Sequence, residues 1–189
     1  RHHHPGAAFD RRFGKGAAFT LPNAVEVDVH RTLCLGPYGL AIDLDDLLFD
    51  VDRFTLATRE LPALGRHWRF LHACYHTSLS GPHRRLSAVR DVAQLLPRTP
   101  ADAHRVVCTA ERSGGVAVVA QALACAAELL RWQPDGFAGE LLRWGQQLRP
   151  TARDRRWLAG YGRGASGSRT RTLLAAEALP TTRQRMLYA

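Results

Sequence analysis

The strongest constraint on the fold comes from apolar side chains that recur at helical spacing between residues 66 and 132. In the segment "RRLSAVRDVAQLL", for example, Leu86, Val89 and Leu96 fall on one side of an α-helix. The breaks "GPH", "PRTP" and "GG" separate such segments, and a weaker one, "DGFAGELLRWGQQL", follows. We therefore predict at least three helices in a compact antiparallel cluster over this region.

The segment "VEVDVH", from Val25 to His30, has a different period. Valines alternate with Glu26, Asp28 and His30, which is typical of a β-strand with an apolar face and a polar face. We expect the valines to point inward, toward the core. The two acids and the histidine would then share the opposite, polar face.

Shorter elements are expected around this strand. "AAFDRRFGKGAAFTLPN" could hold two short strands around the "GKG" turn, and "RFTLATRELPAL" alternates like one further strand. "LAIDLDDLLFD" predicts a short amphipathic helix that Asp43 caps or precedes. The fold class is therefore α+β and mostly helical, with a few N-terminal strands followed by a helical bundle.

Three regions differ in pattern. Residues 1–62 carry the strand signals, and residues 63–150 carry the helical ones. Residues 151–189 read as a basic tail, with a flexible loop at "GYGRGASGSRTRT" and short helices at "LLAAEAL" and "TRQRMLYA".

The positive charge is concentrated toward the C-terminus. The formal net charge is +9, and residues 131–189 hold 11 arginines against 4 acids. Such a tail could bind nucleic acid. We do not favour this partner. Lys15 is the only lysine, and arginine occupies the other Lys/Arg positions throughout the chain. This pattern, with abundant alanine, indicates the codon bias of a GC-rich genome rather than a nucleic-acid-binding surface.

Cysteine usage and hydropathy bear on the compartment. The four cysteines form no C-x-x-C pair and have apolar neighbours, as in "HACYH" and "LACAA", which predicts buried free thiols in a reducing cytoplasm. The most apolar run, "GVAVVAQALACAAELL", has 16 residues and contains Gln121 and Glu128. A span needs about 20 apolar residues, so we expect no membrane partner.

Asp28 is the residue of "VEVDVH" that could hold a metal ion. A strand fixes a carboxylate rigidly, and Mg²⁺ prefers oxygen ligands. One carboxylate cannot form a two-metal site, which needs several converging acids. The acids of "DLDD", residues 43–46, lie in a helix-like context. Without further partners, Asp28 and His30 would be ordinary polar residues on a solvent-facing strand.

Three segments in order carry a family resemblance: "VEVDVHRTL", "RFLHACYH" and "RRLSAVRDVAQLL". Over roughly residues 5–130 they resemble an uncharacterised bacterial group of nucleotidyltransferase-like proteins, which are similar to the polymerase-β type. The resemblance implies that the chain is the C-terminal portion of such a protein. Residues 1–62 would then be a remnant of its α/β layer, with a partial nucleotidyltransferase-type sheet.

The resemblance also implies a site with three carboxylates, two from a D-x-D after a glycine turn and a third from a later strand. Asp28 matches the third position, Glu26 matches it less well, and His30 would orient a ligand. The first two acids would lie upstream of Arg1, since "GKG" has no D-x-D after it. The full protein would use Mg²⁺ to transfer a nucleotidyl group from an NTP to an unknown acceptor, and this chain alone would be inactive.

Two other functions fit the sequence. The chain could be a non-catalytic binding or scaffold module. Alternatively, Arg66, His67 and His72 match the spacing of a HEPN-like ribonuclease, whose histidine acts in acid–base catalysis. His72 and His76 share a helix face but lack a third zinc ligand, so we expect them to be ordinary helix residues.

Overall fold

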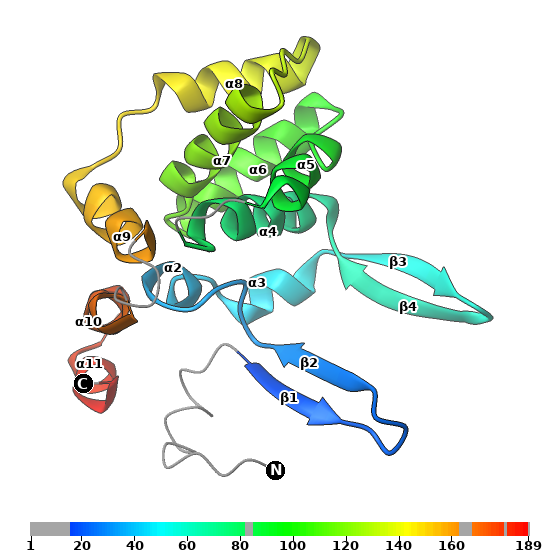
Figure 1. The fold of residues 1–189 in the computed structure, drawn as a ribbon, viewed down its shortest axis with the longest axis vertical. Coiled ribbons are helices and arrows are strands. Elements are labelled where there is room, and N and C mark those ends of the chain that lie inside the picture. Colours follow the sequence, from blue (N-terminus) through cyan, green and yellow to red (C-terminus); the bar gives the residue numbers. More distant parts are fainter. Residues whose placement is uncertain (1–15, 82–84, 163–167, 180, 189) are drawn as a thin grey trace.

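The computed structural model describes residues 16–81, 85–162, 168–179 and 181–188. Helices dominate the described chain, and two small β-hairpins lie on its N-terminal side (Figure 1). The predicted class, α+β and mostly helical, is confirmed.

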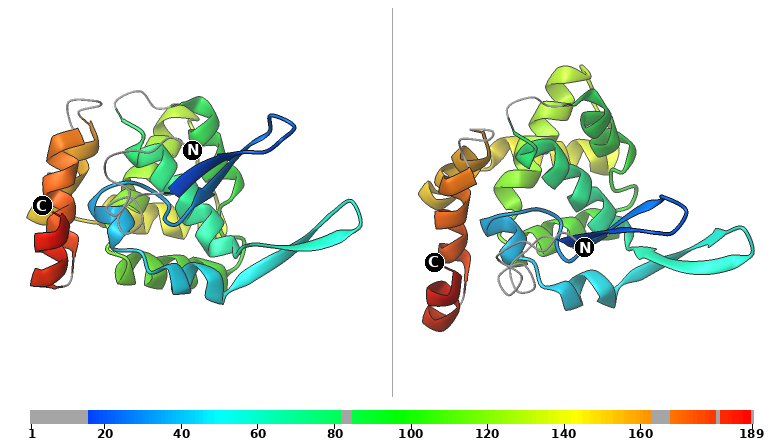
Figure 2. Two further views of the ribbon diagram at one scale, coloured as in Figure 1. Left: turned by 90° about the horizontal axis from the view of Figure 1, so that it is seen from below. Right: turned by 60° about the horizontal axis from the view of Figure 1, so that its bottom comes forward.

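The strands form two separate antiparallel hairpins, β1–β2 and β3–β4. Their bounds are β1 Gly16–Thr20, β2 Glu26–His30, β3 Val51–Leu56 and β4 Arg59–Leu64. Figure 2 shows both hairpins projecting away from the helices without joining into one sheet. The expected strand around Asp28 is therefore present, but it pairs only with β1 among the described residues. The first two residues of the "GKG" segment lie outside the described residues, and its last residue, Gly16, begins β1.

Two short helices connect the hairpins: α2 Pro37–Leu40 and α3 Leu44–Phe49. Asp43 caps α3 as predicted, since its Oδ1 accepts a hydrogen bond from the Asp45 amide at 3.0 Å. The Trp68 indole nitrogen donates to the carbonyl oxygen of Asp46 at 2.9 Å, which ties α3 to the helical region.

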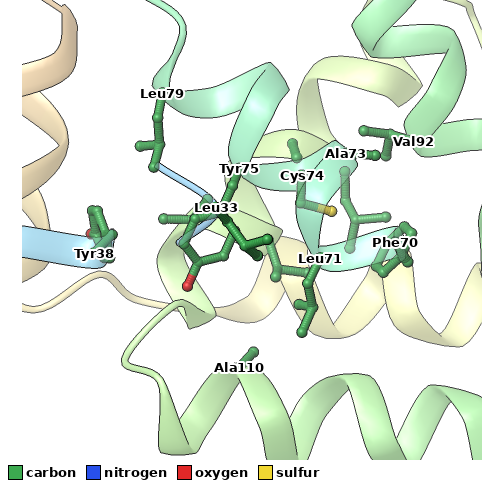
Figure 3. Close-up of a cluster of buried hydrophobic side chains, with 14 of the residues drawn as sticks. Leu33, Tyr38, Phe70, Leu71, Ala73, Cys74, Tyr75, Leu79, Val92 and Ala110 are labelled. Atoms are coloured by element: carbon green, nitrogen blue, oxygen red, sulfur yellow. The ribbon is translucent and has the colours of Figure 1, made fainter. Parts of the chain in front are cut away.

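The predicted helical region is confirmed, and its central element is the first helix. The helices are α4 Arg66–Leu79, α5 Leu86–Gln94, α6 Pro100–Arg112, α7 Val116–Leu129 and α8 Gly136–Gln147. Helix α4 packs against α5, α6 and α7. Its buried side chains, among them Phe70, Leu71 and Tyr75, form the middle of the core (Figure 3).

Helix α6 begins at a side-chain cap whose removal should be measurable. The Thr99 hydroxyl oxygen accepts from the Asp102 amide at 3.1 Å and donates to the Asp102 carboxylate at 2.9 Å. We expect Thr99→Ala to lower the free energy of unfolding by about 1 kcal/mol, because it leaves a helix N–H without its acceptor. Urea denaturation measures this, with Thr99→Ser as the control that keeps the hydroxyl. Equal stability of the alanine and serine variants would contradict the assignment.

The prediction that the valines of β2 point inward is wrong. Val25, Val27 and Val29 are all exposed, as is every residue of β1 and β2. No helix covers either face of this hairpin among the described residues. Alternation therefore separated the apolar and polar faces of the strand, but no layer in the described chain covers the apolar one.

Residues 53–64 also differ from the single strand that we expected. They contribute to two strands, since Leu56 pairs with Arg59 and the chain reverses between them. The turn contains Ala57 at φ 55°, a left-handed conformation that glycine or asparagine would usually occupy. No such residue marks the turn, so no local signal predicted it.

The C-terminal segment is more ordered than a flexible tail. It contains α9 Ala152–Gly162, α10 Ser168–Ala178 and α11 Thr182–Tyr188, so the loop expected at "GYGRGASGSRTRT" is wrong where the structure describes it. Trp157, Tyr161 and Leu174 are buried, and the Tyr161 hydroxyl donates to the Leu35 carbonyl oxygen. Helix α10 also packs against α2. These contacts join the segment to the N-terminal half.

Two smaller observations complete the fold. Cys34, Cys74 and Cys125 are buried as expected, Cys108 is half-buried, and all four are free thiols. Within the described ranges, no helix combines the length and the apolar character that crossing a membrane requires.

Candidate functional site

Asp28 and His30 share the polar face of the β1–β2 hairpin. The antiparallel register places Ala18 opposite Asp28 and Gly16 opposite His30. Directly opposed residues lie on the same face of a sheet, so two small residues adjoin the two functional candidates. The result is a shallow hollow of about 190 Å³ lined by Gly16, Ala17, Ala18, Asp28 and His30.

Gly16 is required for this hollow because the two strands approach closely there. A Cβ atom at Gly16 would lie 2.3 Å from the Val29 carbonyl oxygen and 2.9 Å from the His30 Cα. A larger residue would push the strands apart and displace His30. The hairpin is therefore built so that the Asp28 carboxylate and the His30 imidazole border an open space rather than a packed one.

The carboxylates near this hollow do not by themselves make a magnesium site. Glu26 lies two residues from Asp28 on the same face, but magnesium sites for phosphoryl chemistry use acids that converge from several elements. Among residues 16–81, 85–162, 168–179 and 181–188, no three histidine, cysteine or acidic side chains gather closely enough to hold a metal ion. Asp28 can supply one ligand of such a site, and the others are not in this described set.

Two of the three acids of "DLDD" have structural roles at α3. Asp43 caps the helix, and Asp46 lies 3.7 Å from Arg112 in an ion pair. They are therefore engaged away from the hollow at Asp28.

A second acidic pair, Asp50 and Asp52, leads into β3 as "DVD" and was not among the predicted site residues. Asp52 pairs with Arg69, and Asp50 pairs with Arg105 at 2.5 Å. Nδ1 of His67 lies 3.9 Å from Asp50. A D-x-D at the start of an alternating segment was a visible signal. In the structure these carboxylates are neutralised by arginines and hold β3 against α4 and α6.

Helix α4 carries three histidines, two exposed and one buried. His72 and His76 are exposed, and their rings stack at a centroid distance of 6.2 Å. His67 is buried, and this burial lowers its pKa, although the nearby Asp50 carboxylate opposes the shift. Arg66 and His72 are both exposed and lie six residues apart on α4. This arrangement does not test the ribonuclease alternative, which stays a prediction.

Comparison with known proteins gives one match. A family model described as "Uncharacterised nucleotidyltransferase" matches residues 1–131. No curated protein and no solved structure matches the chain significantly. The matched range includes both hairpins, the hollow at Asp28 and helices α2 to α7.

Proposed function

The chain belongs to the uncharacterised nucleotidyltransferase family, and we propose that Asp28 supplies one metal-binding carboxylate to a nucleotidyl transfer from an NTP. In this reaction an acceptor oxygen attacks the α-phosphorus and loses its proton, while the bond to the β-phosphate oxygen breaks and pyrophosphate leaves. The single observation that carries the proposal is the position of Asp28, on a paired strand beside an open hollow formed by small residues.

Two residues of the β1–β2 hairpin have different roles in this proposal. Asp28 offers the carboxylate, and His30, which borders the same hollow, would orient a phosphate oxygen by donating a hydrogen bond. Mg²⁺ is the metal that carboxylate oxygens and triphosphates favour, and it would neutralise charge that develops on the phosphates. The described residues do not complete its site, so we propose that the other carboxylates come from outside the described ranges.

This proposal predicts that the 189-residue chain alone will not catalyse the transfer. We expect no product above background with Mg²⁺ and ATP, CTP, GTP or UTP, because one carboxylate cannot hold the metal ions and offset the phosphate charge. Transfer of α-³²P label to protein or to small molecules of a cell extract measures it. If the chain shows turnover that Asp28→Asn removes, the other acids lie within this chain and our assignment of the site is wrong.

One observation favours a second candidate, a non-catalytic binding module. Asp43, Asp46, Asp50 and Asp52 are all engaged in caps or ion pairs, which leaves few acids in the first half of the chain for catalysis. Titration of the protein encoded by the complete reading frame with ATP, with and without Mg²⁺, separates the two functions. A nucleotidyltransferase with a completed metal site should bind ATP more tightly when Mg²⁺ is present, and a repurposed module should not respond to the metal.

A further inference from the structure

A second site is formed by a pocket at the start of α4, away from the residues assigned to nucleotidyl transfer. Its cavity of about 190 Å³ lies between the first turn of α4, the loop after α5 and the start of α6. The charged and polar residues that line it are Arg66, His67, Arg69, Gln94, Arg98 and Asp102. Leu96 and Val106 supply an apolar wall.

The first turn of α4 has the wrong charge for a helix start. Acidic residues stabilise the positive end of the helix dipole, and both α3 and α6 have them there. Helix α4 has no acid in its first turn and no side-chain cap. Arg66 and Arg69 occupy that turn instead, which adds positive charge to an already positive end. A bound anion would relieve this repulsion and accept from the unsatisfied backbone N–H groups.

The three arginines of the pocket carry more positive charge than their acidic partners neutralise. Arg69 pairs with Asp52, whereas neither Arg66 nor Arg98 makes an ion pair or hydrogen bond with any residue in the described ranges. Asp102, the one acid in the lining, accepts from the Thr99 hydroxyl in the α6 cap. Three arginines against one aspartate therefore give the lining a net charge of +2 when His67 is neutral. The lining stays more positive than negative after the charge of Asp52 is included.

One buried polar atom in the lining lacks a hydrogen bond. The Nε of Arg69 is buried and has no hydrogen-bond partner among the described residues. An unsatisfied buried polar atom is costly, and a ligand in the pocket can supply the missing acceptor.

A larger open groove of about 870 Å³ continues from this pocket. The two cavities share Gln94, Leu96, Pro97 and Arg98, so one ligand can occupy both. The far part of the groove is lined by two aromatic residues, Trp132 and Phe137. Aromatic side chains in such a groove favour a flat ring.

We propose that the pocket binds the phosphate group of an organic phosphate, and that the organic part of this ligand lies in the adjoining groove. Arg66 and Arg98 donate charge-assisted hydrogen bonds to the phosphate oxygens, and Arg98 lies at the junction of the two cavities. A phosphate group fits the small charged pocket, and a planar ring fits the larger groove. The site uses no residue of the hollow at Asp28 and does not depend on the function proposed for it.

Isothermal titration calorimetry with AMP, in the absence of divalent metal, tests this site. We expect AMP to bind to the 189-residue chain, inorganic phosphate to bind more weakly, and adenosine not to bind detectably. Arg66→Gln and Arg98→Gln should each weaken AMP binding about tenfold or more, because each loses a charge-assisted hydrogen bond. Both arginines are exposed, so the variants should fold, which circular dichroism verifies.

Two control variants make the test specific. Arg143→Gln removes the same charge from an exposed position on α8 outside the pocket, and it should leave AMP affinity within about twofold. Asp28→Asn should also leave it unchanged, which separates this pocket from the hollow on the β1–β2 hairpin. Equal losses in all three arginine variants would show attraction by net charge alone and overturn the proposal. Absence of AMP binding, or tight adenosine binding, would overturn it as well.

Discussion

We expect Leu71→Ala to lower the free energy of unfolding by about 2–5 kcal/mol, the largest stability change among our predictions. The side chain of Leu71 is 0% exposed and lies in the middle of α4, the helix that contacts α5, α6 and α7. Figure 3 shows it on the side of α4 toward Ala110 of α6. Truncation removes buried apolar surface and leaves a cavity that these three helices cannot readily fill.

Leu173→Ala is the matched control for this measurement. It makes the same substitution in the middle of a helix, α10, but at a side chain that is 74% exposed. We expect a change within about 0.5 kcal/mol, since no cavity forms. Chemical denaturation of both variants gives the two free energies of unfolding, provided that both show the same m-value, the slope of that free energy against denaturant concentration. Similar losses at the two positions would contradict the placement of α4 at the centre of the core.

The helical region could be predicted because its information is local. Val89 and Val92, three residues apart on α5, are both fully buried, as their spacing indicates. Thr99 and Asp43 are caps that act within three residues of their own position. Periodicity and capping each need only one turn of helix, so the sequence contains the whole signal.

The contacts that could not be predicted join residues far apart in the chain. Asp50 pairs with Arg105, 55 residues later, and Tyr161 donates to Leu35 across 126 residues. No local pattern distinguishes these residues from other acids, arginines or tyrosines. For this reason the sequence predicts neither the ion pairs around β3 nor the packing of the segment after residue 150 against the N-terminal half.

The candidate site was predictable only in part. Alternation placed Asp28 and His30 on one face, and the structure brings both to one hollow. Alternation also separates the valines onto the other face, but it cannot say whether another layer covers them. The small residues opposite the site, Gly16 and Ala18, depend on the register of the hairpin, which the sequence does not specify. The pocket at Arg66 depends on a loop between α5 and α6, and it has no sequence motif.

The largest functional effect should come from Asp28→Asn in the protein encoded by the complete reading frame around these residues. We expect nucleotidyl transfer to fall on the order of 10²–10³-fold, because the variant loses a metal-binding charge worth several kcal/mol in the transition state. Asparagine keeps the shape of aspartate, so the hairpin should remain intact. Transfer of label from α-³²P NTPs, above the level of the acceptor extract alone, measures the loss.

Asp43→Asn provides the control for this variant. It removes the same charge from the same region, but asparagine caps helices as well as aspartate does. We expect transfer to stay within about twofold of the unmodified protein. A general effect of lowering negative charge would reduce both variants equally, whereas a metal-binding role for Asp28 reduces only one.

The most direct test of the account is the affinity of this complete protein for Mn²⁺ in the presence of ATP, measured by electron paramagnetic resonance with Mn²⁺ in place of Mg²⁺. If Asp28 is a metal ligand, Asp28→Asn should weaken Mn²⁺ binding about tenfold or more, and Asp43→Asn should bind the ion as the unmodified protein does. Unchanged Mn²⁺ affinity in Asp28→Asn would contradict this role and would leave Asp28 as a polar residue on an exposed strand.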